Sequence, residues 1–422
     1  MGTMLILLVL LPAAEPADDA KLALQVRKLV AELDAPTLAA REQAQRELTG
    51  LGQSALPLLP KETGRLSLEQ RTRVAAVRLA IESAAAESTA AGTKVTLSGA
   101  DLPLAEVLAA IEKQTGNKLV DYREKFGQDT EAKKVSVNFS DTPFWQAMDQ
   151  VLAQAGLGVY AYSGEPGLAI VARAGGPDRT KGAVYRGAFR LEPLRLEARR
   201  DLRNPQTDGL KVAVEIGWEP RSAPIALVQK LESLSAVDEN GAPLEVDGRH
   251  GQLEANVQPG SSGSELELPF KAPPRTVAKL GSIKGKLSVL LPGPPGVFRF
   301  EKLAAAQDVQ QQQGRATVTL EKVRDVGEGS WQAVIRVRYE DPGQALESHR
   351  GWIYQNPAYL VGPDGQKIEG GMETTGQTET EVGVAYLFFT GGGIEGYTFV
   401  YETPTAVIAD EVEFELKDLP LP

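Results

Sequence analysis

The chain has 422 residues, a formal net charge of −11 and no cysteine. The length favours about three domains, or four small ones, each able to bury a core. The acidic balance argues against a nucleic acid partner, because phosphate binding needs a concentrated basic surface. The absence of cysteine excludes disulfides, thiolate metal sites and thiol nucleophiles.

The N-terminal stretch MLILLVLLPAAEPADDA predicts a secretory leader over residues 1–19. Its apolar run, residues 4–11, is too short to span a bilayer, and small residues after it suit cleavage following Ala13, Ala14 or Ala17. No Lys or Arg precedes the run, so a start further upstream and a buried helix remain the alternatives. We expect an exported protein, periplasmic or extracellular in a bacterium, with no membrane span after the leader.

Residues 20–90 predict helices. A second helix is expected after Asp34 with Pro36 in its first turn, and a third begins with a capping box of Ser67 and Gln70. The first helix carries an apolar stripe at helical spacing, formed by Leu22, Val26, Leu29, Val30 and Leu33.

The phrase LDAPTLAAREQAQRELTGLGQSALPLL in this segment resembles a HEAT-type repeat. The resemblance implies two antiparallel helices, with a proline in the second one. It covers about fifty residues, which is enough for one or two repeat units and too few for a long solenoid. A small helical bundle is the alternative for the same residues.

Two later stretches of the chain align without a gap. KVTLSGADLPLAEVLAAIEKQTGNKLV begins at Lys94, and KVSVNFSDTPFWQAMDQVLAQAGLGVY begins at Lys134. Each predicts a strand, a helix and a second strand, and LAIVAR adds a closing strand after a hairpin at SGEPG. Each half alone would leave a sheet face and a helix stripe exposed, so we expect the two halves to cover each other.

Both copies use the same devices at the same positions. Asp101 is expected to cap the first helix, with Pro103 in its first turn, and Asp141 or Thr142 with Pro143 to do the same in the second. The apolar helix stripes consist of Leu104, Val107, Leu108 and Ile111 in the first copy, and Phe144, Ala147, Met148 and Val151 in the second.

This duplicated unit resembles the secretin and TonB short N-terminal (STN) domain, whose hallmark is a strand, a D-x-P-like turn and a helix, all repeated. The resemblance covers residues 94–173 and implies a periplasmic protein-interaction and assembly module rather than a catalyst. The sequence that follows residue 173 differs from that of secretins and TonB-dependent receptors. The function of those proteins is therefore not implied for this chain. The matching residues, including the glycines where each helix is expected to end, are Asp101, Pro103, Leu108, Gly116, Asp141, Pro143, Met148 and Gly156.

The remainder of the chain predicts β structure. GGPDRT is typical of a linker, AVDENGAPLEV predicts a hairpin with Asn240 and Gly241 at its turn, and EKLAAAQDVQQQQGR predicts a polar connector. Short strands with turn signals at this spacing favour antiparallel sandwiches. This half also resembles uncharacterised exported bacterial multidomain proteins, which implies no activity.

The predicted fold class is therefore multidomain α + β. A HEAT-like helical domain over residues 20–90 precedes an STN-like duplicated module over residues 91–175. Two antiparallel Ig-like β-sandwiches follow, over residues 180–302 and 312–422.

Candidate catalytic groups are sparse. His250 in DGRHGQ and His349 in ESHRGW lack a G-x-S-x-G elbow and are too few for a zinc site. Asp238 and Glu239 suggest a calcium loop, but a hairpin turn explains DENG better. The 56 acidic residues single out no glycosidase pair, and no nucleotide-binding glycine motif occurs. We predict no catalytic residue, no metal and no cofactor.

The strongest binding candidates are aromatic. Rings with polar neighbours can stack on sugars or anchor a protein partner, although rings that fill a sandwich core are the alternative. Trp145 lies off the stripe of its helix and is a further contact candidate. Two of the rings in ESHRGWIYQNPAYLV are two residues apart and would share a strand face; the candidates in this stretch are Arg350, Trp352, Tyr354, Asn356 and Tyr359.

These observations lead to one main hypothesis and two alternatives. The main one is a non-enzymatic, exported protein-interaction or envelope scaffold protein, which binds a protein partner in the cell envelope through the STN-like module and the sandwich surfaces. The first alternative is carbohydrate or cell-wall binding by the C-terminal sandwich, with a polysaccharide as partner. The weaker one is a glycoside hydrolase with a carboxylate pair, which two acids facing each other across a cleft would support.

Overall fold

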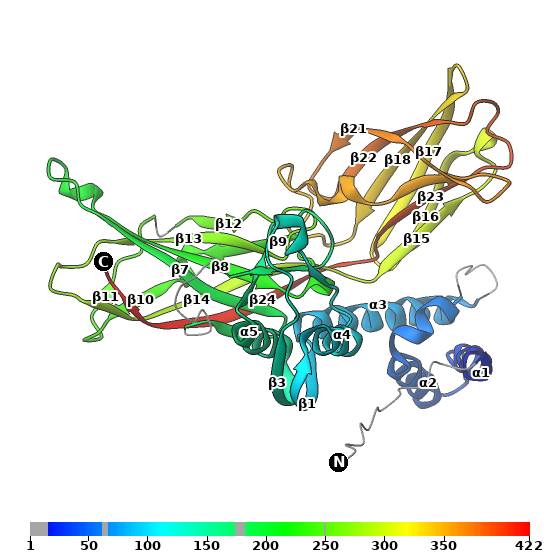
Figure 1. Cartoon of the computed structure of the whole chain (residues 1–422). Coiled ribbons are helices and arrows are strands. Elements are labelled where there is room, and N and C mark those ends of the chain that lie inside the picture. Colours follow the sequence, from blue (N-terminus) through cyan, green and yellow to red (C-terminus); the bar gives the residue numbers. More distant parts are fainter. Residues whose placement is uncertain (1–15, 61–65, 174–181, 249) are drawn as a thin grey trace, which may run out of the picture. The chain divides into compact units, whose positions relative to one another are not determined.

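The computed structural model describes residues 16–60, 66–173, 182–248 and 250–422. The chain divides into two compact units, Met1–Ala85 and Ala86–Pro422, and the boundary falls within helix α3 (Leu68–Ala90). Helices come first and antiparallel sheets dominate later, so the mixed α and β class is confirmed at that level (Figure 1). Within the described ranges, no helix combines the length and apolar character that a bilayer crossing requires. The apolar run of the predicted leader and the predicted linker GGPDRT lie outside the described residues.

The N-terminal unit consists of helices around one apolar core. The predicted stripe is buried along α1, apart from Leu22, which is half-buried. The elements are α1 (Pro16–Glu32), α2 (Leu38–Gly50), η1 (Gly52–Leu58) and the start of α3. Their core residues are Val26, Leu29, Val30, Leu33, Ala44, Leu48, Ala55, Leu59, Val74, Val77 and Ile81.

The helix starts in this unit confirm one predicted cap and correct another. The Gln70 backbone N donates to Ser67 Oγ at 3.1 Å, and the Ser67 N donates to Gln70 Oε1 at 3.0 Å, which is the predicted capping box. Helix α2 begins later than expected, because Thr37 is its cap and accepts from the Ala40 N at 3.3 Å. Pro36 therefore precedes the helix instead of lying in its first turn.

The duplicated stretch, which we call the module, folds as two small sheets and two helices. β1 (Lys94–Pro103) and β3 (Lys134–Pro143) form a two-stranded antiparallel sheet, and Figure 1 shows them side by side next to the helices. The second sheet has the order β2-β5-β4, with β2 (Leu119–Asp121), β4 (Leu157–Tyr160) and β5 (Leu168–Ala172). The helical elements are α4 (Leu104–Thr115), η2 (Glu124–Phe126) and α5 (Phe144–Ala155). Side chains of both copies share one core, so the two halves cover each other as predicted.

The aspartates of the two D-x-P-like turns do not cap the helices. Asp101 and Asp141 have left-handed backbone conformations, with φ of 52° and 53°, at shifts in the pairing of β1 with β3. Each strand runs directly into its helix, and Pro103 and Pro143 stand at the N-cap position without a side-chain cap. The predicted caps are wrong, because these aspartates occupy β-bulges, where short polar side chains tolerate positive φ.

A glutamine side chain from each helix bonds to the main chain of the adjacent strand. Gln114 accepts from the Thr96 N at 3.0 Å and donates to the Thr96 carbonyl at 3.1 Å. Gln154 makes the same two bonds with Ser136, at 3.1 Å and 3.0 Å. Because both main-chain groups are occupied at these two positions, they cannot pair with an added strand.

The first β region has two sheets over a common core. The predicted alternation in β8 is confirmed, because Leu210, Val212, Val214, Ile216 and Trp218 are all buried. One sheet has the order β13-β8-β7-β6, with β6 (Val184–Arg186), β7 (Phe189–Arg199), β8 (Gly209–Trp218) and β13 (Gly263–Lys271). The other has the order β11-β10-β14-β9-β12, with β9 (Ala226–Lys230), β10 (Ser235–Asp238), β11 (Pro243–Leu244), β12 (Gln252–Ala255) and β14 (Lys279–Pro292). Short turns of helix connect them: η3 (Pro205–Thr207), η4 (Pro220–Ser222) and η5 (Leu231–Ser233).

The predicted hairpin in AVDENGAPLEV is confirmed. β10 pairs with β11, and Gly241 at the turn has a φ of 81°. The Asp238 carboxylate accepts from the backbone N of Asn240 and of Ala242, at 2.8 Å and 2.9 Å. The Asp238 carboxylate therefore stabilises the turn in which it lies.

The second β region also has two sheets over a common core. One has the order β15-β23-β19-β20, with β15 (Pro295–Phe300), β19 (Ala358–Val361), β20 (Lys367–Glu369) and β23 (Thr398–Pro404). The other has the order β16-β17-β18-β22-β21, with β16 (Gln307–Gln313), β17 (Ala316–Gly327), β18 (Ser330–Tyr339), β21 (Gly371–Gln377) and β22 (Glu381–Phe389). η6 (Leu303–Ala305) and η7 (Gly351–Gln355) are short helical turns.

The glutamine-rich stretch expected to be a connector is the strand β16. Its Gln311 side chain donates to the Arg299 carbonyl and accepts from the Arg299 N, at 2.5 Å and 3.4 Å. Gln313 donates to the Val297 carbonyl at 2.8 Å. The polar side chains thus bond to the backbone of β15, which explains why a strand without an apolar pattern is retained here.

The two β regions exchange strands, so their boundaries differ from those of the two predicted sandwiches, residues 180–302 and 312–422. β24 (Val407–Pro420), the last strand of the chain, pairs with β14 of the first region (Figure 1). β15 precedes residue 302 but pairs with β23 of the second region. The first core therefore contains residues from the chain end, namely Val412, Phe414, Leu416 and Leu419.

Buried polar contacts fix the module on the first β region. Glu219, which follows β8, is fully buried. Its carboxylate accepts from the Thr93 N and hydroxyl at 2.7 Å and 2.9 Å, and from Asn117 Nδ2 at 2.9 Å. Arg221 Nε adds a charge-assisted bond at 2.8 Å. A buried carboxylate with this many donors ties the start of β1 and the end of α4 to the β8 strand.

A second buried group joins α5 to the same sheet. Arg190 on β7 donates from Nε to Asp149 Oδ2 of α5 at 2.7 Å. Its guanidinium also lies 2.7 Å from Glu192 and 3.5 Å from Glu215. The Tyr185 hydroxyl donates to the same Asp149 oxygen at 2.6 Å. One cation thus serves three carboxylates where the module meets the sheet.

Candidate functional site

The aromatic candidates of the second β region do not form a shared platform. Trp352 and Tyr354 lie in η7, so the prediction that they share a strand face is wrong. Trp352 Nε1 donates to the Ala345 carbonyl at 2.7 Å, and the Tyr354 hydroxyl donates to Gln377 at 2.8 Å. Both rings are half-buried against the core of this region. Tyr359 on β19 is only 8% exposed, and its hydroxyl donates to a glutamate of β23 at 2.8 Å.

Trp145 of α5 is buried and is not available to an external partner in this structure. The Trp145 ring packs against Gly217 of β8, where an added Cβ would lie only 3.3 Å from the ring. Its Nε1 donates to the Ala188 carbonyl at 3.0 Å. Trp145 is therefore not the contact candidate that the sequence suggested, because the side of α5 that carries Trp145 and Asp149 packs against residues of the first β region. Trp145 is thus an internal anchor between the module and the first β region.

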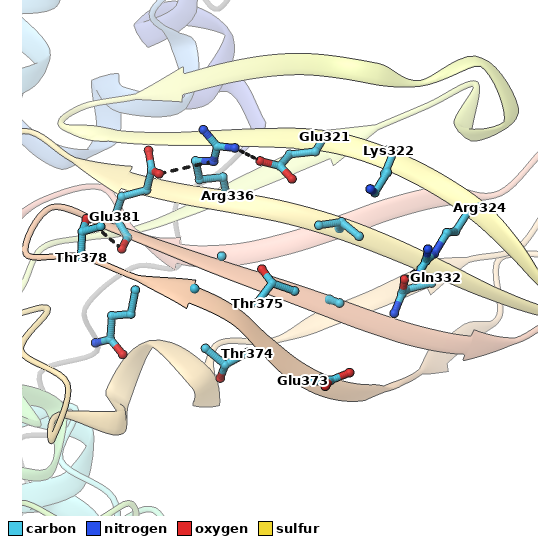
Figure 2. Close-up of a pocket in the computed structure, with 15 residues that line it drawn as sticks. Glu321, Lys322, Arg324, Gln332, Arg336, Glu373, Thr374, Thr375, Thr378 and Glu381 are labelled. Carbon is cyan, nitrogen blue, oxygen red and sulfur yellow. Dashed lines mark hydrogen bonds and ion pairs between the residues drawn. The ribbon is translucent and has the colours of Figure 1, made fainter.

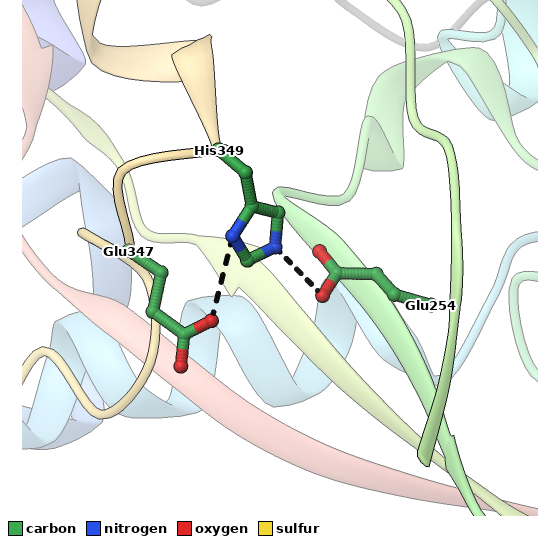
Figure 3. Close-up of side chains that lie close together, drawn as sticks. All are labelled: Glu254, Glu347 and His349. Carbon is green, nitrogen blue, oxygen red and sulfur yellow. Dashed lines mark hydrogen bonds and ion pairs between the residues drawn. The ribbon is translucent and has the colours of Figure 1, made fainter.

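Arg350 is the centre of a charged cluster that joins the two β regions. The Glu254 carboxylate on β12 accepts hydrogen bonds from Nε and Nη2 of Arg350, both at 2.7 Å, in a bidentate ion pair. His349 Nε2 lies 3.0 Å from the same carboxylate, and its Nδ1 lies 3.7 Å from Glu347, as Figure 3 shows. Burial works to raise the pKa of Glu254, but the bonds from Arg350 and His349 outweigh it and hold this pKa below its ordinary value.

The chemistry of this cluster favours a structural ion pair over a metal centre. Glu254, Glu347 and His349 could each offer one ligand atom within 4.8 Å of the others. However, His349 faces the two carboxylates with different ring nitrogens, and the guanidinium already neutralises Glu254. A divalent cation would have to displace Arg350, whose side chain is 2% exposed, from this position.

The cluster borders a cleft of about 580 Å³. Three of the predicted binding residues line it, namely Arg350, Trp352 and Asn356, whereas Trp145, Tyr354 and Tyr359 do not. Asn356 Nδ2 already donates to the Tyr401 hydroxyl and to Thr403 Oγ1. Among the residues that line this cleft, Glu254 is the one acid, and the Arg350 pair holds it. The cleft therefore lacks the facing carboxylates that a glycosidase needs.

We expect Glu254→Gln to destabilise the Ala86–Pro422 unit at neutral pH, and the loss to disappear in acid. The folded-state pKa of Glu254 lies below its ordinary 4.5, so its ionised form is favoured in the fold. Its contribution is fully present above pH 4.5 and is lost as the pH falls through the lowered value. Urea unfolding of both proteins over a pH series measures the difference. Glu373→Gln, an exposed change on β21, is the control, and equal stability of Glu254→Gln and the unchanged protein at neutral pH would contradict the expectation.

The module carries a group of exposed aromatic side chains that we call the aromatic row: Phe126, Tyr160 and Tyr162. They are 51%, 37% and 44% exposed. Phe126 and Tyr160 meet edge to face with ring centroids 5.3 Å apart, and Tyr160 and Tyr162 do so at 6.2 Å. Lys125 lies beside the row and pairs with Glu165 at 2.6 Å. Neighbouring aromatic side chains left this exposed are typical of contact surfaces.

The second β region carries a hollow of about 780 Å³ on the outer face of its five-stranded sheet, which we call the trough (Figure 2). Arg336 on β18 lies between Glu321 and Glu381 and forms ion pairs with both. Arg324 donates to Gln332 Oε1 at 2.7 Å. The other labelled side chains of Figure 2 come from β17 and from the β21 side, which supplies the hydroxyl groups.

Sequence reasoning missed Glu254, the aromatic row and the trough. Glu254 lies 95 residues before His349 and 96 before Arg350, so no local pattern joins them. The alternation of Tyr160 and Tyr162 in GVYAY was a local signal, but Phe126 reaches them only through the fold. In comparisons with known proteins, no family model matches the chain and no curated protein matches it.

Proposed function

We propose that this chain is a non-enzymatic, exported protein-interaction or envelope scaffold protein whose module carries the partner contact. In this proposal the helical segment is HEAT-like, the module is STN-like and the two β regions are Ig-like sandwiches. The duplicated strand–helix–strand order of the module supports the STN-like assignment. The two pairs of antiparallel sheets, each over one core, support the sandwich assignment.

The observation that carries the proposal is the aromatic row. Large apolar rings lose contact with water when a partner covers them, and rings near the centre of an interface supply much of its binding energy. Phe126 is half exposed although it belongs to a module with a well-filled core. Other faces of the module are occupied: Trp145 and Asp149 of α5 contact the first β region, and Gln114 and Gln154 close strand positions.

Replacing Phe126 and Tyr160 with serine should weaken capture of the partner about tenfold or more. The measurement is affinity capture from envelope extract of the native host, with the unchanged protein and the double variant as baits. Point variants suit this test better than deletion of residues 94–173, because deletion would uncover the buried carboxylate of Glu219. Both side chains lie at the surface, so we expect the thermal unfolding midpoint to change little.

The matched control is Phe389→Ser, which removes an exposed ring on β22, 66% exposed, from the second β region. Capture of the same stoichiometric partner by the Phe389→Ser bait and not by the double variant would support the proposal. Equal capture by all baits, or no stoichiometric partner with the unchanged protein, would count against it.

A further inference from the structure

The trough is suited to a ligand of balanced charge that offers many hydroxyl groups. Its lining holds three basic side chains, Lys322, Arg324 and Arg336, and three acidic ones, Glu321, Glu373 and Glu381. Arg336 is engaged by Glu321 and Glu381, and Arg324 by an amide. Such a surface has no excess charge to attract an anion or a metal ion, but its planar groups offer paired donors and acceptors.

The floor of the trough is formed in part by residues with small side chains or none. Gly383 and Ala385 of β22 lie in it, and a Cβ on Gly383 would come within 2.5 Å of Thr375 Oγ1. Because Gly383 has no side chain, the Thr375 hydroxyl of β21 can lie over the neighbouring strand β22. Thr374, Thr375 and Thr378 add hydroxyl groups along one side, where Figure 2 shows the first two beside the strand.

An apolar strip continues the same face of β22. Residues that alternate along a strand share one face, so Leu387 and Phe389 lie on the side of Gly383 and Ala385. They are 48% and 66% exposed. A ring at the end of a row of polar groups can stack on the apolar face of a sugar ring while the polar groups bond to its hydroxyls.

We infer that the trough binds a neutral oligosaccharide or polysaccharide chain, with Phe389 stacking on one sugar ring. An extended peptide fits less well, because the main-chain groups of β17, β18 and β22 are used within the sheet and only an open edge could pair with it. The inference relocates sugar binding from Trp352, Tyr354 and Tyr359 to the outer sheet face. It is independent of the proposed protein contact on the module.

The test is native gel electrophoresis of the full chain in gels that contain a soluble polysaccharide. The neutral probes are hydroxyethylcellulose and dextran, and polygalacturonate is the acidic probe. We expect one neutral glucan to retard the protein. Phe389→Ser and the isosteric Thr375→Val should each raise the apparent dissociation constant about tenfold.

Phe126→Ser is the control, because it removes an exposed ring from the aromatic row and should leave the retardation unchanged. Circular dichroism of each variant verifies that it is folded. Unchanged mobility in both neutral glucans, or retardation by polygalacturonate alone, would overturn the inference. So would retardation of the Phe389→Ser and Thr375→Val variants equal to that of the unchanged protein. Loss of sugar binding and loss of partner capture are separable, since each uses the other's variant as its control.

Discussion

Replacing Arg190 with methionine should lower the free energy of unfolding of the Ala86–Pro422 unit by about 3–5 kcal/mol. Arg190 is 6% exposed and is the cation that Asp149, Glu192 and Glu215 share. Methionine keeps most of the apolar stem but removes the charge, so buried carboxylates lose their counterion. Burial works to lower the pKa of Arg190, but the three acids outweigh it and raise this pKa, so the guanidinium remains charged.

Urea unfolding followed by tryptophan fluorescence measures this effect, since the Arg190 guanidinium lies 6.0 Å from the ring centroid of Trp145. Arg195→Met is a matched control, because Arg195 also contacts three acids, Glu197, Glu265 and Glu267, but its side chain is 48% exposed. In water such pairs contribute little, so we expect a loss below about 1 kcal/mol. Equal losses for the two variants would mean that burial of the Arg190 group does not matter for stability.

Ending the chain after Ala406 should prevent the first β region from folding, although all of residues 180–302 remain. The truncation removes β24, which pairs along β14. It also removes Val412, Phe414, Leu416 and Leu419 from the first core. Burying each such side chain contributes about 1.5–3 kcal/mol, and four of them together approach the roughly 5–15 kcal/mol of a whole domain.

Soluble yield, circular dichroism and limited proteolysis measure this outcome. Leu416→Ala tests the same strand without truncation and should cost about 2–5 kcal/mol, because Leu416 is fully buried. Lys417→Ala, on the exposed side of β24, should change stability by no more than about 0.5 kcal/mol. Cooperative unfolding of the truncated protein with undiminished β content would contradict the role assigned to β24.

Periodic patterns in the sequence predicted most elements because burial follows the same periods. The stripe of α1 and the alternation of β8 depend on neighbours within a few residues. So do the predicted helix ends, because Gly116 and Gly156 end α4 and α5 with left-handed backbone conformations. The predictions that were wrong concern choices between local alternatives. Asp101 could cap a helix or occupy a bulge, and the pairing of β1 with β3 decided for the bulge. The polar strand β16 has no apolar alternation, and only β15 beside it explains its glutamines.

The candidate sites depended still more on distant contacts. Trp145 and Tyr359 are aromatic in the sequence and buried in the structure, whereas Phe126 and Phe389, which no sequence motif singles out, are exposed. A residue type sets what a side chain can do, but its exposure is set by whichever element packs on it. For Trp145 that element is the β7–β8 pair, which follows it in the chain.

By itself the sequence determined most of the helices and strands in their order, the duplication of the strand–helix–strand unit and the hairpin turn at Gly241. These are local consequences of residue size, polarity and backbone preference. The tertiary structure alone decided that β24 belongs to the first core, that Arg350 pairs with Glu254, and that Phe126, Tyr160 and Tyr162 meet at the surface. Each of these joins segments that are far apart in the chain. Such contacts form because they bury more apolar surface, or pair more charge, than the local alternatives, and no short-range pattern records that balance.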